Sequence, residues 1–112
     1  MGDRDERVAH NQTLFRELNE RLREITETIA PGDAGALELF CECGRADCME
    51  KIHVPALAYE AVRARAELFV VAPAHDVETV ERVLERADGY WIVEKHEEEA
   101  QTARDTDPRG RG

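Results

Sequence analysis

The chain has 112 residues, enough for about one domain, and it is acidic: 25 acidic residues against 15 lysines and arginines give a net charge of −10 at pH 7. Segments 1–30, 31–95 and 96–112 each hold more acids than bases. Because no segment supplies the basic surface that neutralises phosphates, we expect no nucleic-acid binding and no attachment to an anionic membrane. The N-terminal residues lack an apolar signal segment and no apolar run reaches the length of a membrane span, so we expect a cytoplasmic protein.

Residues 8–29 are predicted to form one long amphipathic helix. Its stripe follows a heptad pattern with one polar member: Val8, Asn11, Phe15, Leu18, Leu22, Ile25 and Ile29. Two interpretations stay open, since the helix could cover the core of its own domain or form a homodimer through Val8–Ile29. The flanking positions, which include Gln12 and Asn19, lack the complementary charges usual in coiled coils.

A β-hairpin is predicted after the proline- and glycine-containing turn at residues 30–36. From Leu37 the chain alternates, with Leu37, Leu39, Cys41 and Cys43 on one face of a strand and Glu38 and Glu42 on the other. "GRAD" turns the chain into a second strand, where Ile52 and Val54 face inward and Lys51 and His53 face outward.

Two helices and two strands are predicted in the rest of the folded part. Pro55 opens a helix, "ELFVVAP" is a short strand, and "YWIVEK" is the last strand. Between those strands, the spacing of Val77, Val80, Leu84 and Ala87 predicts a helix with Asp76 as N-cap and Gly89 just past its end. Residues 96–112 have no apolar periodicity and are predicted to be a mobile charged tail.

All three cysteines lie in the spacing C-x-C-x4-C, at positions 41, 43 and 48. In a reducing cytosol, clustered cysteines hold a metal more often than a disulfide, and an odd number of thiols cannot all pair within one chain. Thiolates exclude magnesium and calcium and favour zinc, and Gly44 allows a tight bend beneath the ion. We therefore predict a zinc site; the alternative is that the cysteines are small apolar core residues.

The fourth ligand must come from elsewhere in the chain, which offers His10, His53, His75 and His96. His10 belongs to the leading helix and His96 borders the tail, while strand parity places His53 on the face opposite Ile52 and Val54. His75 follows a buried strand at a turn, a position from which a side chain can return to the site. We therefore favour His75.

The sequence resembles a family of small uncharacterised bacterial proteins that is frequent in actinobacteria. The residues that carry the resemblance cover nearly the whole chain: Phe40, Cys41, Glu42, Cys43, Cys48, Ile52, Tyr59, Glu60, Val62, Arg63, Phe69, His75, Val93, Glu94, Lys95, Asp107, Pro108 and Arg109. The resemblance implies a Cys3His metal site of Cys41, Cys43, Cys48 and His75, and it implies no activity. It also implies that the terminal D-P-R is a short docking segment. This chain departs from the pattern at Ala74, where glycine is more familiar.

The predicted fold is therefore α+β: a long N-terminal amphipathic helix (1–30), a small β-β-α-β-α-β zinc-stabilised domain (36–95) and a mobile tail (96–112). Four protein ligands would fill a tetrahedral shell, whereas a catalytic zinc keeps an open position, and no catalytic motif is present in the sequence. We expect no enzyme but a zinc-binding, regulatory protein–protein interaction module with an unidentified protein partner. The alternative is a thiol-based redox sensor that releases zinc on oxidation, with Arg45 and Lys51 lowering the thiol pKa values. A zinc-dependent enzyme ranks last.

Overall fold

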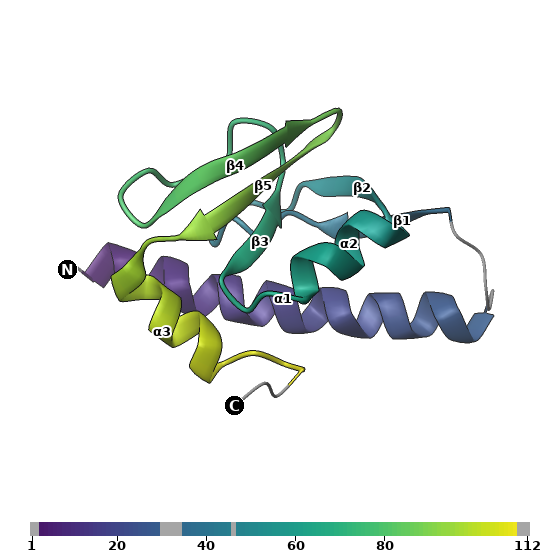
Figure 1. Ribbon diagram of the computed structural model, residues 1–112, viewed down its shortest axis with the longest axis horizontal. Coiled ribbons are helices and arrows are strands. Elements are labelled where there is room, and N and C mark those ends of the chain that lie inside the picture. Colours follow the sequence, from purple (N-terminus) through teal and green to yellow (C-terminus); the bar gives the residue numbers. More distant parts are fainter. Residues whose placement is uncertain (1–2, 30–34, 46, 110–112) are drawn as a thin grey trace.

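The computed structural model describes residues 3–29, 35–45 and 47–109. Within them the elements run in the order α1 (Asp3–Ile29), β1 (Ala36–Phe40), β2 (Lys51–Pro55), α2 (Ala56–Arg63), β3 (Leu68–Val71), β4 (Glu81–Ala87), β5 (Tyr90–Lys95) and α3 (Glu97–Asp105). Two antiparallel sheets, β1-β2 and β3-β5-β4, lie on one side of the long helix α1 (Figure 1). The α+β class is confirmed, whereas the order of elements differs from the predicted one.

The predicted β-hairpin is confirmed as β1 and β2. Glu38 pairs with His53 and Leu39 with Ile52, so the apolar side chains face inward and His53 is exposed. β1 ends at Phe40, earlier than the alternation suggested. The Cys41 N–H still bonds Glu50 of the hairpin at 2.8 Å, but the next N–H, that of Glu42, bonds Val70 of β3 at 2.8 Å. The chain therefore leaves one sheet for the other between the first two cysteines.

The helix predicted after His75 is wrong, because residues Glu81–Ala87 form strand β4. Ala87 pairs with Tyr90, which leaves Asp88 and Gly89 as a two-residue hairpin turn with Gly89 at φ +86°. Asp-Gly is a strong hairpin signal, and it outweighs the helical spacing of the valines. Opposite charges also face each other across the strands, Glu81 with Lys95 and Arg82 with Glu94, which favours the strand pairing. Asp76 is consequently no helix cap, and Gly89 lies in the hairpin turn between β4 and β5.

Helix α1 contacts the rest of the protein through a polar face. Its buried polar side chains are Gln12, Arg16, Asn19 and Glu20, and Val8 is the one buried apolar side chain among those described in α1. Leu14, Leu18 and Ile25 are exposed, at 50%, 37% and 53%. The predicted stripe therefore covers the core only in part: Val8 is buried and Leu22 packs against the core cluster, whereas Leu18 and Ile25 are exposed. A neighbouring polar face of the helix forms hydrogen bonds with the rest of the protein. The Ile29 side chain and the turn residues 30–34 lie outside the described residues.

The C-terminal segment is helical and packed, in contrast to the predicted mobile tail. Ala100 and Ala103 of α3 are buried, and the Ala103 carbonyl accepts a hydrogen bond from Arg16 of α1 at 2.8 Å. Beyond the helix, Arg109 binds the carboxylates of Glu20 and Glu60. Arg109 thus forms ion pairs with α1 and α2, and Arg104 pairs with Glu67, which precedes β3.

One apolar cluster joins the two sheets, and it includes all three cysteines together with Val54, Tyr59, Phe69 and Val93. The segment that holds the three cysteines is therefore part of the core and not a surface loop. None of the helices in the described part of the chain has the length and apolar character needed to cross a membrane.

Candidate metal centre

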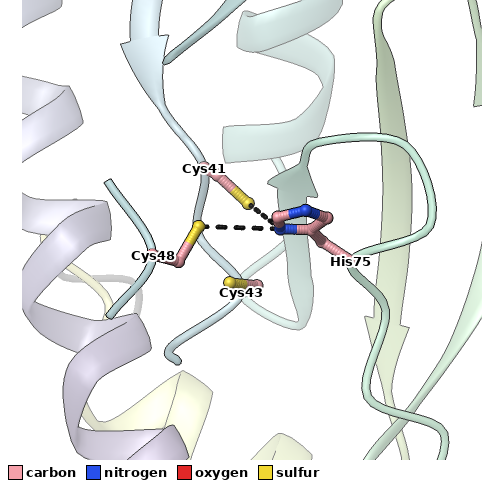
Figure 2. A group of neighbouring side chains, drawn as sticks. All are labelled: Cys41, Cys43, Cys48 and His75. Atoms are coloured by element: carbon pink, nitrogen blue, oxygen red, sulfur yellow. Dashed lines mark hydrogen bonds between the residues drawn. The ribbon is translucent and has the colours of Figure 1, made fainter. Parts of the chain in front are cut away.

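Four potential ligands converge from three places in the chain (Figure 2). Cys41 and Cys43 lie on the segment that follows β1, Cys48 precedes β2, and His75 follows β3. Their ligand atoms, three Sγ and one ring nitrogen, all lie within 4.8 Å of one another. The four residues are therefore grouped closely enough to hold a metal ion, as the sequence predicted.

The separations of His75 from two of the sulfurs fit a tetrahedral ion. Its Nδ1 atom lies 3.6 Å from Cys41 Sγ and 3.6 Å from Cys48 Sγ. Bonds of about 2.3 Å to sulfur and about 2.0–2.1 Å to nitrogen at tetrahedral angles place S and N about 3.5–3.6 Å apart. A single ring N–H, in contrast, points at only one acceptor in a good hydrogen bond. The donor set of thiolates and imidazole is that of zinc.

A tight turn presents His75 to the cysteines. The His75 N–H bonds the Ala72 carbonyl at 3.0 Å, with Pro73 and Ala74 between them. Ala74 has φ +65°, the left-handed conformation that the third residue of a type II turn adopts and that glycine prefers. Glycine would therefore also fit at position 74. Alanine adopts the same conformation, so the ligand keeps its place.

Backbone N–H groups surround the sulfurs and lower the energy of thiolates. The Ala72 N–H donates to Cys41 Sγ at 3.1 Å, and the backbone N–H groups of Arg45 and Glu50 favour the thiolate forms of Cys43 and Cys48. The hydrogen bond that Cys41 donates to Cys43 lowers the pKa of Cys43 to about 5. The same bond, together with burial, raises the pKa of Cys41, and burial raises that of Cys48.

A buried ion pair lies on the face of the cysteine segment opposite the sulfurs. The Glu42 side chain, between Cys41 and Cys43 in sequence, binds Arg63 of α2 at 2.8 Å and 3.2 Å. It also accepts hydrogen bonds from Asn19 of α1 at 2.7 Å and from the Val70 N–H of β3 at 3.0 Å. Glu42 therefore links the cysteine segment to three other elements.

Sequence reasoning placed Glu42 on the opposite face of the strand but did not foresee that this face is buried. Glu42 and Arg63 both occur among the residues that carry the family resemblance, but the resemblance assigns no role to either residue. No local pattern indicates the pair, because the two residues are far apart in sequence and each is an ordinary charge in its own element. An acidic residue between two cysteines that face the core was the one available signal.

Gly44 allows the cysteine segment to approach α1 closely. Its φ is +79°, and a Cβ at this position would lie 2.4 Å from the Val8 carbonyl oxygen and 2.7 Å from Gln12 Cγ. The bend predicted at Gly44 is thus present, and it has a second cause in the contact with the helix.

The other histidines and the two nearby bases lie outside the cluster. His53 is exposed beside Glu38, at 3.5 Å. His10 is exposed, and the His96 ring contacts the Glu78 carbonyl oxygen at 3.1 Å. Arg45 reaches the Asp76 carbonyl at 3.5 Å, and Lys51 extends over the Phe40 ring towards Glu38. The described contacts of the two bases therefore lead away from the sulfurs.

No family model matches the chain, and comparisons with the curated proteins and with the solved structures find no match either.

Proposed function

We propose that the protein is a zinc-binding protein–protein interaction module, regulatory and non-catalytic, with a structural zinc held by Cys41, Cys43, Cys48 and His75. The observation that carries the proposal is the convergence of these four ligand atoms within 4.8 Å. Three thiolates and one imidazole fill a tetrahedral shell and leave no position for the water that a catalytic zinc activates.

Burial of the sulfurs favours a structural site over the redox-sensor alternative. Cys41 and Cys43 are 1% and 0% exposed and Cys48 is 8% exposed. Oxidants react with accessible thiolates, so buried and metal-bound sulfurs react slowly. A slow release of zinc by mild peroxide, followed with a chromogenic chelator, supports the structural role; rapid stoichiometric release would favour the sensor.

The interaction surface that we propose is the exposed stripe of α1, formed by Leu14, Leu18 and Ile25. These three side chains lie on one side of the helix, and their exposure leaves apolar area available to a partner. We propose a second copy of the chain as the occupant, in a homodimer formed by α1.

Metal content tests the first part of the proposal. Purified protein should hold one zinc per chain, and Cys43→Ser should lose it, because the variant lacks one of the four ligands of the site. His53→Ala, whose ring lies outside the cluster, is the matched control and should keep its zinc. Less than half an equivalent in well-folded protein contradicts the proposal.

Sedimentation tests the second part. The double variant Leu14→Glu/Leu18→Glu should be a monomer at concentrations where the native chain is a dimer, because it places charges in the apolar contact. Leu57→Glu is the control, since Leu57 of α2 is 80% exposed and lies outside the stripe. If the native chain sediments as a monomer, the homodimer is excluded, and the exposed stripe would then bind a different protein.

A further inference from the structure

The segment Phe40–Gly44 has two faces with different tasks. Cys41 and Cys43 point towards the other two residues of the Cys3His group, Cys48 and His75 (Figure 2). The alternate residues Phe40, Glu42 and Gly44 contact helix α1. Alternation of side chains along an extended backbone produces this division. The same five residues therefore form part of the metal site and part of the surface on which α1 lies.

Asn19 provides the central contact between helix and segment. Its amide oxygen accepts the Phe40 N–H at 2.9 Å, and its amide nitrogen donates to the Phe40 carbonyl at 2.9 Å and to Glu42 at 2.7 Å. Asn19 is fully buried. One side chain thus fixes both the backbone and the carboxylate of the residues that flank Cys41.

A second contact lies about two to three turns earlier in the helix. Asn11 donates to the Gly44 carbonyl at 2.9 Å, and the Gly44 Cα lies so close to α1 that a Cβ would meet the Val8 carbonyl oxygen. This contact holds the residue directly after Cys43. The helix therefore contacts the segment on both sides of the two cysteines.

The polar nature of the α1 face makes its docking sensitive to the shape of this segment. Gln12, Arg16, Asn19 and Glu20 are held by hydrogen bonds, which require defined partner positions and which water replaces when the helix separates. Apolar contacts tolerate small displacements of a partner better, but Val8 is the one buried apolar side chain described in α1.

We infer that metal binding and the docking of α1 are thermodynamically coupled through residues 40–44. The inference rests on the proposed zinc site and assigns its regulation: loss of the metal loosens α1, and a loosened α1 weakens metal binding by the same factor. Because α1 also carries the exposed stripe, metal occupancy controls how that stripe is presented to a partner.

Hydrogen–deuterium exchange of the 112-residue chain tests the first half of this coupling. Removing zinc with a chelator should raise exchange in peptides from residues 10–26 by roughly tenfold or more, while peptides from the β4–β5 hairpin change much less. Unchanged exchange in α1 after zinc removal overturns the inference. Equal acceleration in α1 and in the hairpin also overturns it, because the metal would then support the whole fold without selecting α1.

Zinc affinity of two helix variants tests the reciprocal half. Asn19→Ala removes the contacts to Phe40 and Glu42 without changing a ligand, and it should weaken zinc binding about fivefold or more in competition with a chelator. Arg21→Ala, an exposed position on the same helix, is the control and should bind zinc like the native chain. Equal affinities for the two variants overturn the coupling while the zinc site stands. Absence of zinc binding in the native chain refutes the proposed function itself.

Discussion

Glu42 and Arg63 form a bidentate ion pair behind the cysteine cluster, at 2.8 Å and 3.2 Å, with side chains that are 0% and 1% exposed. A buried pair of this kind need not add net stability, but the removal of one partner leaves a charge without compensation in the core. Helix α2, strand β3 and helix α1 all meet the cysteine segment at this carboxylate.

Replacement of this carboxylate should be costly. Glu42→Gln keeps the shape of the side chain and removes its charge, so Arg63 stays buried without a counterion, and we expect a loss of about 3–5 kcal/mol in the free energy of unfolding. Glu38→Gln is the control, since Glu38 is 57% exposed beside Lys51 and His53. It should change stability by less than about 1 kcal/mol in the same urea titration. Similar losses for the two variants would show that the buried pair has no special role.

Alanine variants of Gly44 and Gly89 distinguish the cost of steric crowding from the cost of backbone strain, because both glycines have a positive φ. Gly44→Ala should lose about 2–5 kcal/mol, because it combines a left-handed residue with a Cβ pressed against α1. Gly89→Ala should lose only about 1–2 kcal/mol, since its φ is also positive but nothing lies within 4 Å of the added Cβ. Thermal unfolding of both variants measures the difference. Equal losses would contradict the close approach of Gly44 to Val8.

The turn that presents His75 should become more stable with glycine. Ala74→Gly relieves a left-handed alanine, and after the greater backbone entropy of glycine is subtracted we expect a gain of about 0.5–1 kcal/mol. Ala64→Gly is the control with the opposite sign, because Ala64 has the helical φ of −65° and should lose stability. A loss at position 74 would show that the turn is not left-handed there.

Ion pairing of the C-terminal segment should appear as a pH dependence. Hydrogen bonds from Arg109 and Arg23 lower the pKa of Glu60 from 4.5 to about 2. A carboxyl group with a lowered folded-state pKa stabilises the fold above its unfolded pKa, and this stabilisation is lost as the pH falls through the folded value. Stability should therefore decrease between pH 4.5 and pH 2 through this group.

Arg109→Gln removes the guanidinium that contributes most to the lowered pKa of Glu60. The Glu60 carboxyl of this variant should therefore titrate closer to its ordinary pKa in an NMR titration. Because Glu60 is 41% exposed, solvent screening makes the stability change smaller than the pKa shift alone would give. An identical titration curve in the variant would mean that the segment beyond α3 does not bind Glu60 in solution.

Much of the metal centre could be predicted from sequence, because its information is local. The C-x-C spacing on an alternating strand placed Cys41 and Cys43 on one face, and strand parity separated His53 from the cluster. His75 follows a strand whose central residues are all apolar, so its position near the core could be inferred as well.

The orientation of α1 could not be predicted in this way. Its buried residues are polar, and their partners Glu81 and Arg109 lie far away in the sequence. The apolar heptad is the stronger local signal, but only tertiary contacts decide which face is covered. The same reason applies to β4, where pairing with β5 overrides a helical spacing.

Zinc K-edge absorption spectroscopy of the purified 112-residue chain tests the Cys3His centre most directly. The proposed site predicts a spectrum from three sulfur ligands at about 2.3 Å and one nitrogen ligand at about 2.0–2.1 Å. In His75→Ala the contribution of the imidazole ring to the spectrum should disappear, whereas His53→Ala should leave the native spectrum unchanged. A zinc shell dominated by oxygen, or a native spectrum unaffected by His75→Ala, would contradict the site.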